Sequence, residues 1–145
     1  MQSLHPLIVH FPIALLLTGA GLELLAWIFK RPGLRTVALW NLSLGTLAAG
    51  AAVWTGLRAE DVAKHSFEIW KVMELHERLG ISTLILGVMV VSWRLTRRDQ
   101  LSDRARFLTR VLMLAMVGTL IGGAYLGGRL VYEFGVGGTF GAPVK

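Results

Sequence analysis

Apolar residues along the chain fall into four long runs separated by short polar links. The runs cover about 7–29, 37–57, 75–95 and 110–128. Each has roughly the 20 residues that a helix needs to cross a bilayer, and a segment in lipid must satisfy its own backbone hydrogen bonds. Short links make neighbouring helices antiparallel. The pattern predicts an all-α integral membrane protein, an up-down four-helix bundle that forms one domain over residues 1–145.

Local signals place the ends of these helices. The stretch KRPGLR, with Pro32 and Gly33, ends the first helix, and Ser102 or Asp103 is suited to cap the last one. The link before the third run, DVAKHSFEIWKVMELHERLG, has helical spacing with Asp61 as its possible cap. We expect an amphipathic interfacial piece there that continues into the third span.

Small residues recur inside two of the spans at the spacing of helix contacts. Residues of this kind let helix backbones approach each other in membranes, and close packing is our interpretation of them. The alternative is that they leave room for a flat ligand. The second span carries Gly45, Ala49 and Ala52, and the fourth carries the pairs Gly118/Gly122 and Gly123/Gly127.

Charge gives the orientation. The chain is 54% hydrophobic with a mean hydropathy of +0.59 and a net charge of +6, and nine of its 15 basic residues lie in the links 30–36 and 94–110. Basic residues in short loops mark the cytoplasmic face, so we expect both termini outside. Neither aromatic interleaving nor a motif supports nucleic-acid binding, and the expected partner of the helices is the lipid bilayer.

Several other classes receive no support from the sequence. Met1–Leu4 has no basic start and the first run is too long for a signal peptide, so we expect the first span to be retained. The chain has no cysteine, which excludes disulfides, thiolate metal sites and covalently attached haem. It contains no serine-hydrolase or nucleotide-binding motif, and whether it is an enzyme stays open.

All four histidines fall on the side opposite the basic links. His10 lies about one turn inside the first span, and His76 lies at the outer end of the third. These two spans run in the same direction and are diagonal partners in an up-down bundle, so a side chain from each can meet the other across the centre. The other two histidines are His5 and His65.

Two facing imidazoles are the ligands that a six-coordinate haem needs, and without cysteine the haem is haem b, held non-covalently. We therefore predict a haem b between His10 and His76 that serves electron transfer. His5 is an alternative ligand or a support behind the ligands. Arg78 and Arg129 lie near the outer surface, where the propionates would seek cations.

Two other interpretations stay open. The first is a copper or zinc site formed by His5, His10 and His76, with Glu77 or Glu133 as a further ligand. The second is a structural or assembly subunit of a membrane redox complex that carries no cofactor, in which the histidines only cap helices and bind carbonyls.

One acidic residue lies inside an apolar run. Glu23 is about 20 Å along the helix from His10, since each residue rises 1.5 Å, and so lies near the inner leaflet. We expect it to extend toward Lys30 or Arg35, or to pair with another basic residue. A proton relay toward the outer site is the functional alternative.

The motifs LHPLIVHFPIALL, HERLG and LGGRLVYEFGVG, which together cover nearly the whole chain, resemble a bacterial family of predicted membrane proteins, the domain of unknown function numbered 2231. The resemblance implies a small four-span protein of the bacterial inner membrane. It also implies a redox setting, because some members are fused to or encoded near c-type cytochromes, and so a c-type cytochrome or another redox membrane subunit as partner. His65 has no place in the family pattern. Tyr132 and Glu133 are expected to close the outer side of the site. The residues that the pattern singles out are His5, His10, His76, Gly127, Gly128, Tyr132, Glu133 and Gly135.

Overall fold

The computed structural model describes residues 5–60, 66–97 and 102–136, and this part of the chain is helical without strands. Four helical stretches are long and apolar enough to cross a membrane, which confirms the four predicted spans. The expected cap at Asp61 and the position of His65 lie outside the described residues. The helices are α1 (His5–Ile8), α2 (His10–Ile28), α3 (Pro32–Glu60), α4 (Phe67–Arg97) and α5 (Asp103–Tyr132).

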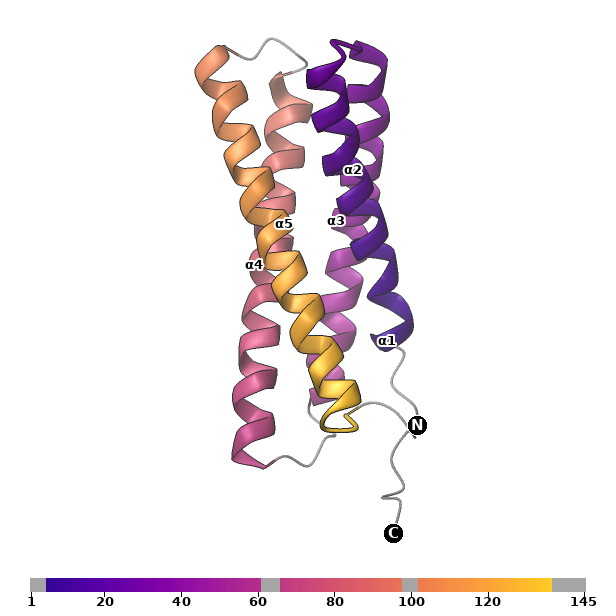
Figure 1. Cartoon of the computed structure of the whole chain (residues 1–145), viewed down its shortest axis with the longest axis vertical. Helices are drawn as coiled ribbons and strands as arrows, with labels where there is room; N and C mark the ends of the chain where they lie inside the picture. The colour runs from indigo at the N-terminus through magenta and orange to yellow at the C-terminus, as the bar shows by residue number, and fades with distance from the viewer. Residues whose placement is uncertain (1–4, 61–65, 98–101, 137–145) are drawn as a thin grey trace.

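The helices form an up-down bundle (Figure 1). α2 packs against α3 and α5, and α4 packs against the same two helices, so α2 and α4 are diagonal partners. The start of α1, the end of α3, the start of α4 and the end of α5 lie together at the lower end of Figure 1. We call this the histidine end, because it carries His5, His10 and His76, and the opposite end the basic end.

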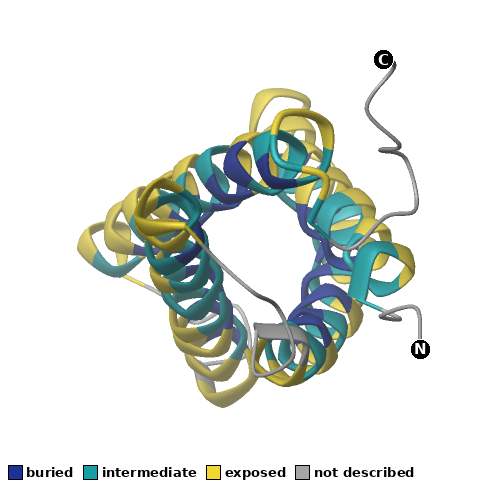
Figure 2. Ribbon diagram, turned by 90° about the horizontal axis from the view of Figure 1, so that it is seen from below, coloured by how far each residue is buried: buried dark blue, intermediate teal, exposed yellow. Residues whose placement is uncertain are grey.

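The buried residues face the inside of the bundle, and the residues on its outside are largely exposed (Figure 2). Many of the exposed side chains are large and apolar, including Trp40, Leu47 and Leu114 at 66–72% exposure. Such a surface suits lipid and is unfavourable in water. The chain is a multi-pass membrane protein. Its inner core is formed by Leu16, Leu42, Ala49, Val90, Met113, Met116 and Leu120.

Proline explains the break between α1 and α2 at Val9. The Ile8 carbonyl lies four residues before Pro12, which has no N–H to donate to it. Val9 nevertheless keeps helical angles, with φ −61° and ψ −23°. The break is therefore a lost hydrogen bond inside one membrane span, and it separates the turn that carries His5 from the rest of the span.

The predicted helix end near KRPG is confirmed, and Lys30 makes the turn. Lys30 has a φ of 51°, a left-handed conformation that L side chains rarely adopt. The Arg31 N–H reaches back to the Ala26 carbonyl at 3.1 Å, the pattern in which glycine usually occupies the left-handed position. α3 then begins at Pro32, where the missing N–H costs little.

Replacing Lys30 with glycine is expected to raise the free energy of unfolding by about 1 kcal/mol, because glycine removes the left-handed penalty. Thermal unfolding of the detergent-solubilised protein, followed by circular dichroism, measures the gain. Lys30→Ala is the control, since it removes the same charge and keeps a Cβ. Equal stabilisation by both variants would attribute the gain to charge and contradict the backbone explanation.

Two further helix ends follow the sequence. α4 begins at Phe67, where the Ser66 hydroxyl lies 3.5 Å from the Ile69 N–H, so within the described residues the interfacial stretch is continuous with the third span. At the start of α5 the Ser102 hydroxyl accepts from the Ala105 N–H at 3.4 Å. The cap is therefore Ser102 and not Asp103.

The structure shows close contacts at some of the small residues predicted to pack and none at another. Gly45 lies against Leu16, where an added Cβ would come within 2.8 Å of the leucine side chain. Gly122 and Gly123 lie against Leu79, so close packing is confirmed at these three glycines. Gly118 is exposed, and no described atom lies within 4 Å of an added Cβ, so Gly118 makes no close helix contact within the described part of the chain.

Candidate functional site

His5 is held by α3. Its Nδ1 lies 2.9 Å from the Ala52 carbonyl oxygen and 3.3 Å from the Thr55 hydroxyl, which itself donates to the Ala51 carbonyl. A carbonyl oxygen only accepts hydrogen bonds, so the hydrogen of a neutral His5 ring sits on Nδ1. The ring also packs on Gly56, where an added Cβ would come within 3.0 Å of Cε1.

His76 is held in the same way by α5. Its Nδ1 lies 2.8 Å from the Gly123 carbonyl oxygen, which places the hydrogen of the neutral ring on Nδ1. The ring packs on Gly127, and an added Cβ there would come within 3.0 Å of Cε1. Each imidazole therefore lies between a backbone carbonyl and a glycine of a neighbouring helix.

The two rings meet across the bundle. The centroids of His5 and His76 are 6.1 Å apart and the ring planes are 84° to each other. The hydrogen bonds of both rings to other described residues are made through Nδ1 alone. Both Nε2 atoms therefore keep a lone pair for a ligand, and a carbonyl bound to the other ring nitrogen is the support that metal-bound histidines usually have.

His10 does not take the place that the sequence prediction gave it. A ring of the first span does meet His76 across the diagonal, but that ring is His5, and His10 is exposed at the surface of the bundle. Five residues turn an ideal helix by about 500°, which separates the two side chains by about 140° around the axis. When His5 faces the interior, His10 consequently lies on another side.

The arginines expected near the haem propionates already have partners. Arg78 donates to Glu74 at 2.6 Å, and the Nε of Arg129 donates to Glu133 at 2.9 Å, each within one helix turn. The Arg129 hydrogen bond lowers the pKa of the exposed Glu133 carboxyl. Tyr132 is 90% exposed. These residues surround the histidine end without contacting the two rings through any hydrogen bond between described residues.

Metal ligands do not gather in larger groups. No three His, Asp or Glu side chains of the described residues lie where they could hold one metal ion. The expected copper or zinc site of His5, His10 and His76 is thus not formed, because His10 is exposed while the other two rings are partly enclosed. Glu77 and Glu133 do not complete it either.

Glu23 pairs with a basic residue, as one of the sequence interpretations had it. The partner is Arg94 of α4, whose Nη1 lies 2.5 Å from Oε2 of Glu23. The second nitrogen, Nη2, donates to the Arg35 carbonyl at 3.2 Å. The pair joins the diagonal helices α2 and α4 at the basic end, far along the bundle from the histidines.

Comparison with protein families identifies the family to which this chain belongs. The model of the family described as "Predicted membrane protein (DUF2231)" matches residues 1–139. The chain belongs to the DUF2231 family. No curated protein and no solved structure matches it. Membership of the DUF2231 family confirms the family resemblance seen in the sequence.

Sequence reasoning missed the supports of the two rings in this DUF2231 protein. The Ala52 and Gly123 carbonyls carry no sequence signal, because every residue has a carbonyl. Gly127 belongs to the motif LGGRLVYEFGVG and packs on His76, whereas Gly56, which packs on His5, lies in no motif. Arg94 could have been found, since it is a base inside the third span near the same end as the acid Glu23.

Proposed function

We propose that this protein is a membrane-embedded haem b protein for electron transfer, with His5 and His76 as the iron ligands. The observation that supports it is the pair of imidazoles 6.1 Å apart, each fixed through Nδ1 and each with Nε2 open. A centroid separation of this size suits two imidazoles that each bind one metal ion through Nε2 at about 2 Å. When bound, haem supplies one-electron chemistry whose potential depends on its ligands and surroundings.

The number of ligands favours haem over copper or zinc. Structural zinc sites take four protein ligands and catalytic ones three, while a porphyrin leaves only two positions for the protein. Two rings meet here, and the described residues offer no third ligand beside them. The chain's own task in this proposal is to hold both rings in one tautomer and one orientation, which the Ala52 and Gly123 carbonyls do.

The charge pattern supports an orientation for the proposal. Links rich in Lys and Arg lie at the basic end, so that end faces the cytoplasm and the histidine end faces outward. In a bacterial inner membrane the site then lies on the periplasmic side. A c-type cytochrome or another redox subunit of the membrane is the partner that such a site would serve.

The test is a reduced-minus-oxidised optical spectrum of the detergent-purified protein, expressed with ample haem precursor. We expect sharp, split α and β bands from a six-coordinate haem, and their loss in His5→Ala and His76→Ala. His10→Ala is the matched control, because it removes an exposed histidine of the same span, and its spectrum should be unchanged.

A further variant distinguishes the loss of an iron ligand from misfolding, because it is expected to keep the haem. His5→Met keeps a possible axial ligand, and a methionine–histidine pair raises the potential of a haem. The expected result is a bound haem with an altered spectrum and a higher midpoint potential. A colourless wild-type protein, or a spectrum that depends on His10 and not on His5, would contradict the proposal.

A further inference from the structure

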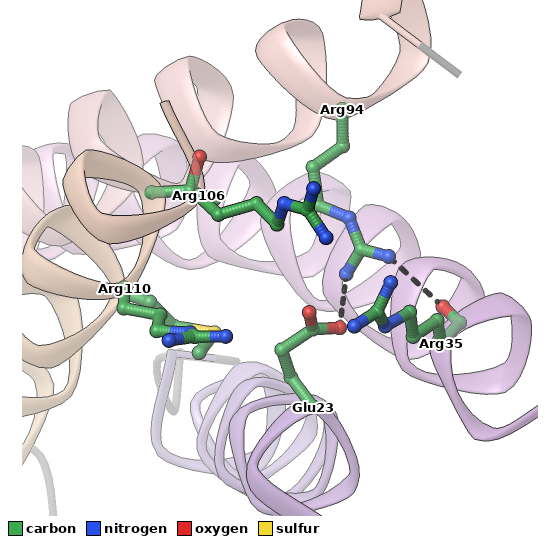
Figure 3. Close-up of a pocket in the computed structure, with 7 residues that line it drawn as sticks. Glu23, Arg35, Arg94, Arg106 and Arg110 are labelled. Atoms are coloured by element: carbon green, nitrogen blue, oxygen red, sulfur yellow. Dashed lines mark hydrogen bonds and ion pairs between the residues drawn. The ribbon is translucent and has the colours of Figure 1, made fainter. Parts of the chain in front are cut away.

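A second cluster of charge lies at the basic end, remote from the histidines. A pocket there is lined by residues of four helices, and its polar groups converge on one carboxylate (Figure 3). The lining contains four arginines against a single acid, an excess of three positive charges. Its residues are Glu23, Arg35, Arg94, Arg106, Thr109, Arg110 and Met113.

One arginine is already neutralised by the protein. Arg94 is buried, pairs with Glu23 and donates to the Arg35 carbonyl. Buried charges in a membrane protein are paired in this way because an isolated one is costly. Arg94 and Glu23 therefore neutralise each other inside the pocket. The ligand that the pocket attracts depends on the remaining arginines.

The other three arginines have weaker partners or none. Arg106 is 3.5 Å from Asp103, whose side chain is fully exposed, so this pair is worth little. Arg110 lies over the ring of Trp27 at 4.6 Å, which orients its guanidinium without cancelling its charge. The guanidinium of Arg35 makes no hydrogen bond or ion pair with another described residue.

We propose that this pocket binds the phosphate group of an anionic phospholipid such as phosphatidylglycerol. Guanidinium groups bind phosphate oxygens through paired N–H donors, and three of them line this pocket in addition to the Arg94 that neutralises Glu23. Basic pockets between membrane helices on the cytoplasmic side are typical sites for such headgroups.

The surroundings favour a lipid as the source of the phosphate. The pocket lies near the ends of the candidate membrane spans, and Trp27, whose ring Arg110 covers, is half exposed. An adjoining hollow lined by Trp27, Lys30 and Pro32 shares Arg35 with the first. The cationic surface therefore continues around the end of α2 next to apolar surface, where acyl chains would lie.

The test compares lipid affinities of the full chain in detergent by native mass spectrometry. Phosphatidylglycerol, phosphatidylcholine and inorganic phosphate are titrated against the wild type and against the double variant Arg35→Gln/Arg106→Gln. One basic residue near a membrane surface changes affinity about fivefold, so the double variant should bind phosphatidylglycerol about 25-fold more weakly. Binding of phosphatidylcholine should stay unchanged.

The matched control is Arg58→Gln/Lys71→Gln, which removes two charges at the histidine end, where both cations lie over exposed rings. It should keep the wild-type affinity for phosphatidylglycerol. Equal losses in both double variants, or no preference of the wild type for phosphatidylglycerol over phosphatidylcholine, would overturn the proposal. Displacement of the lipid by inorganic phosphate at similar concentration would show a free-phosphate site and overturn the lipid assignment.

A measurement on the wild type keeps the proposal falsifiable if the glutamine variant does not fold. The affinity for phosphatidylglycerol should fall as salt rises from about 0.05 to 0.5 M, because salt screens the attraction between the partly exposed arginines and the phosphate. An affinity that does not change with salt would overturn the proposal. The experiment requires no haem, so its result is independent of the proposed function.

Discussion

Glu23→Gln is expected to destabilise the bundle by about 3–5 kcal/mol, the cost of breaking a buried ion pair by removing one partner. The side chains of Glu23 and Arg94 are only 19% and 7% exposed, and the pair joins helices that lie across the diagonal of the bundle. Glutamine keeps a hydrogen-bonding group of similar shape. The loss therefore measures the uncompensated charge of Arg94 and not a cavity.

The surroundings of the ion pair make the loss of Glu23 and the loss of Arg94 differ in their cost to stability. Three further arginines, Arg35, Arg106 and Arg110, line the pocket with Glu23. Among the described residues, Arg94 has no acid beside it in the pocket other than Glu23. Arg94→Gln should therefore cost less than Glu23→Gln, because the remaining arginines can turn toward the carboxylate. The double variant Glu23→Leu/Arg94→Met, which removes both charges, should be close to the wild type.

Unfolding of the purified protein in mixed detergent and SDS, followed by circular dichroism, measures these differences. The control is Glu74→Gln, which breaks the exposed pair with Arg78 on one helix and should cost less than about 1 kcal/mol. If Glu23→Gln and Glu74→Gln cost the same, or if Arg94→Gln costs the more of the two buried changes, the assignment of the charges is wrong.

The architecture was predictable because its cause is local. Each span is an apolar run of sufficient length, and the links carry the helix-breaking and capping residues at Pro32 and Ser102. The number, order and direction of the spans therefore follow from the sequence alone, whereas the break at Val9 that divides the first span into α1 and α2 does not. The sequence predicts where the turn at Lys30 lies but not its conformation, because no sequence pattern predicts that a lysine takes a φ of 51°. The diagonal pairing of the first and third spans follows from topology.

The site was predictable only to the level of which spans supply it. Choosing between His5 and His10 requires the rotation of one helix about its axis, and the break at Val9 before Pro12 makes an ideal helix a poor guide there. Rotation is set by contacts such as His5 with Ala52, which are 47 residues apart in the chain. Arg78 and Arg129 lie at the histidine end, as the sequence order implies, but each is paired with a glutamate one turn away, which the sequence prediction did not include.

Gly45→Val is expected to destabilise the bundle by about 3 kcal/mol, because it fills space that another side chain occupies. An added Cβ at Gly45 would lie 2.8 Å from Cδ2 and 2.9 Å from Cγ of Leu16, and 3.1 Å from Cβ of Leu15. Leu16 is fully buried, so it has no free volume into which to retreat. The two branches of valine add to this overlap, and α2 and α3 must separate to accept them.

Gly118→Val is the matched control, since the same change in the middle of another span meets nothing within 4 Å of the added Cβ. Valine and glycine differ by less than about 0.5 kcal/mol in helix propensity, so this variant should unfold like the wild type. The sequence gives both glycines the same interpretation, as small residues at a helix contact. Equal destabilisation by the two variants would contradict this prediction, because the contact with Leu16, which Gly118 lacks, would then not be the cause of the cost at Gly45.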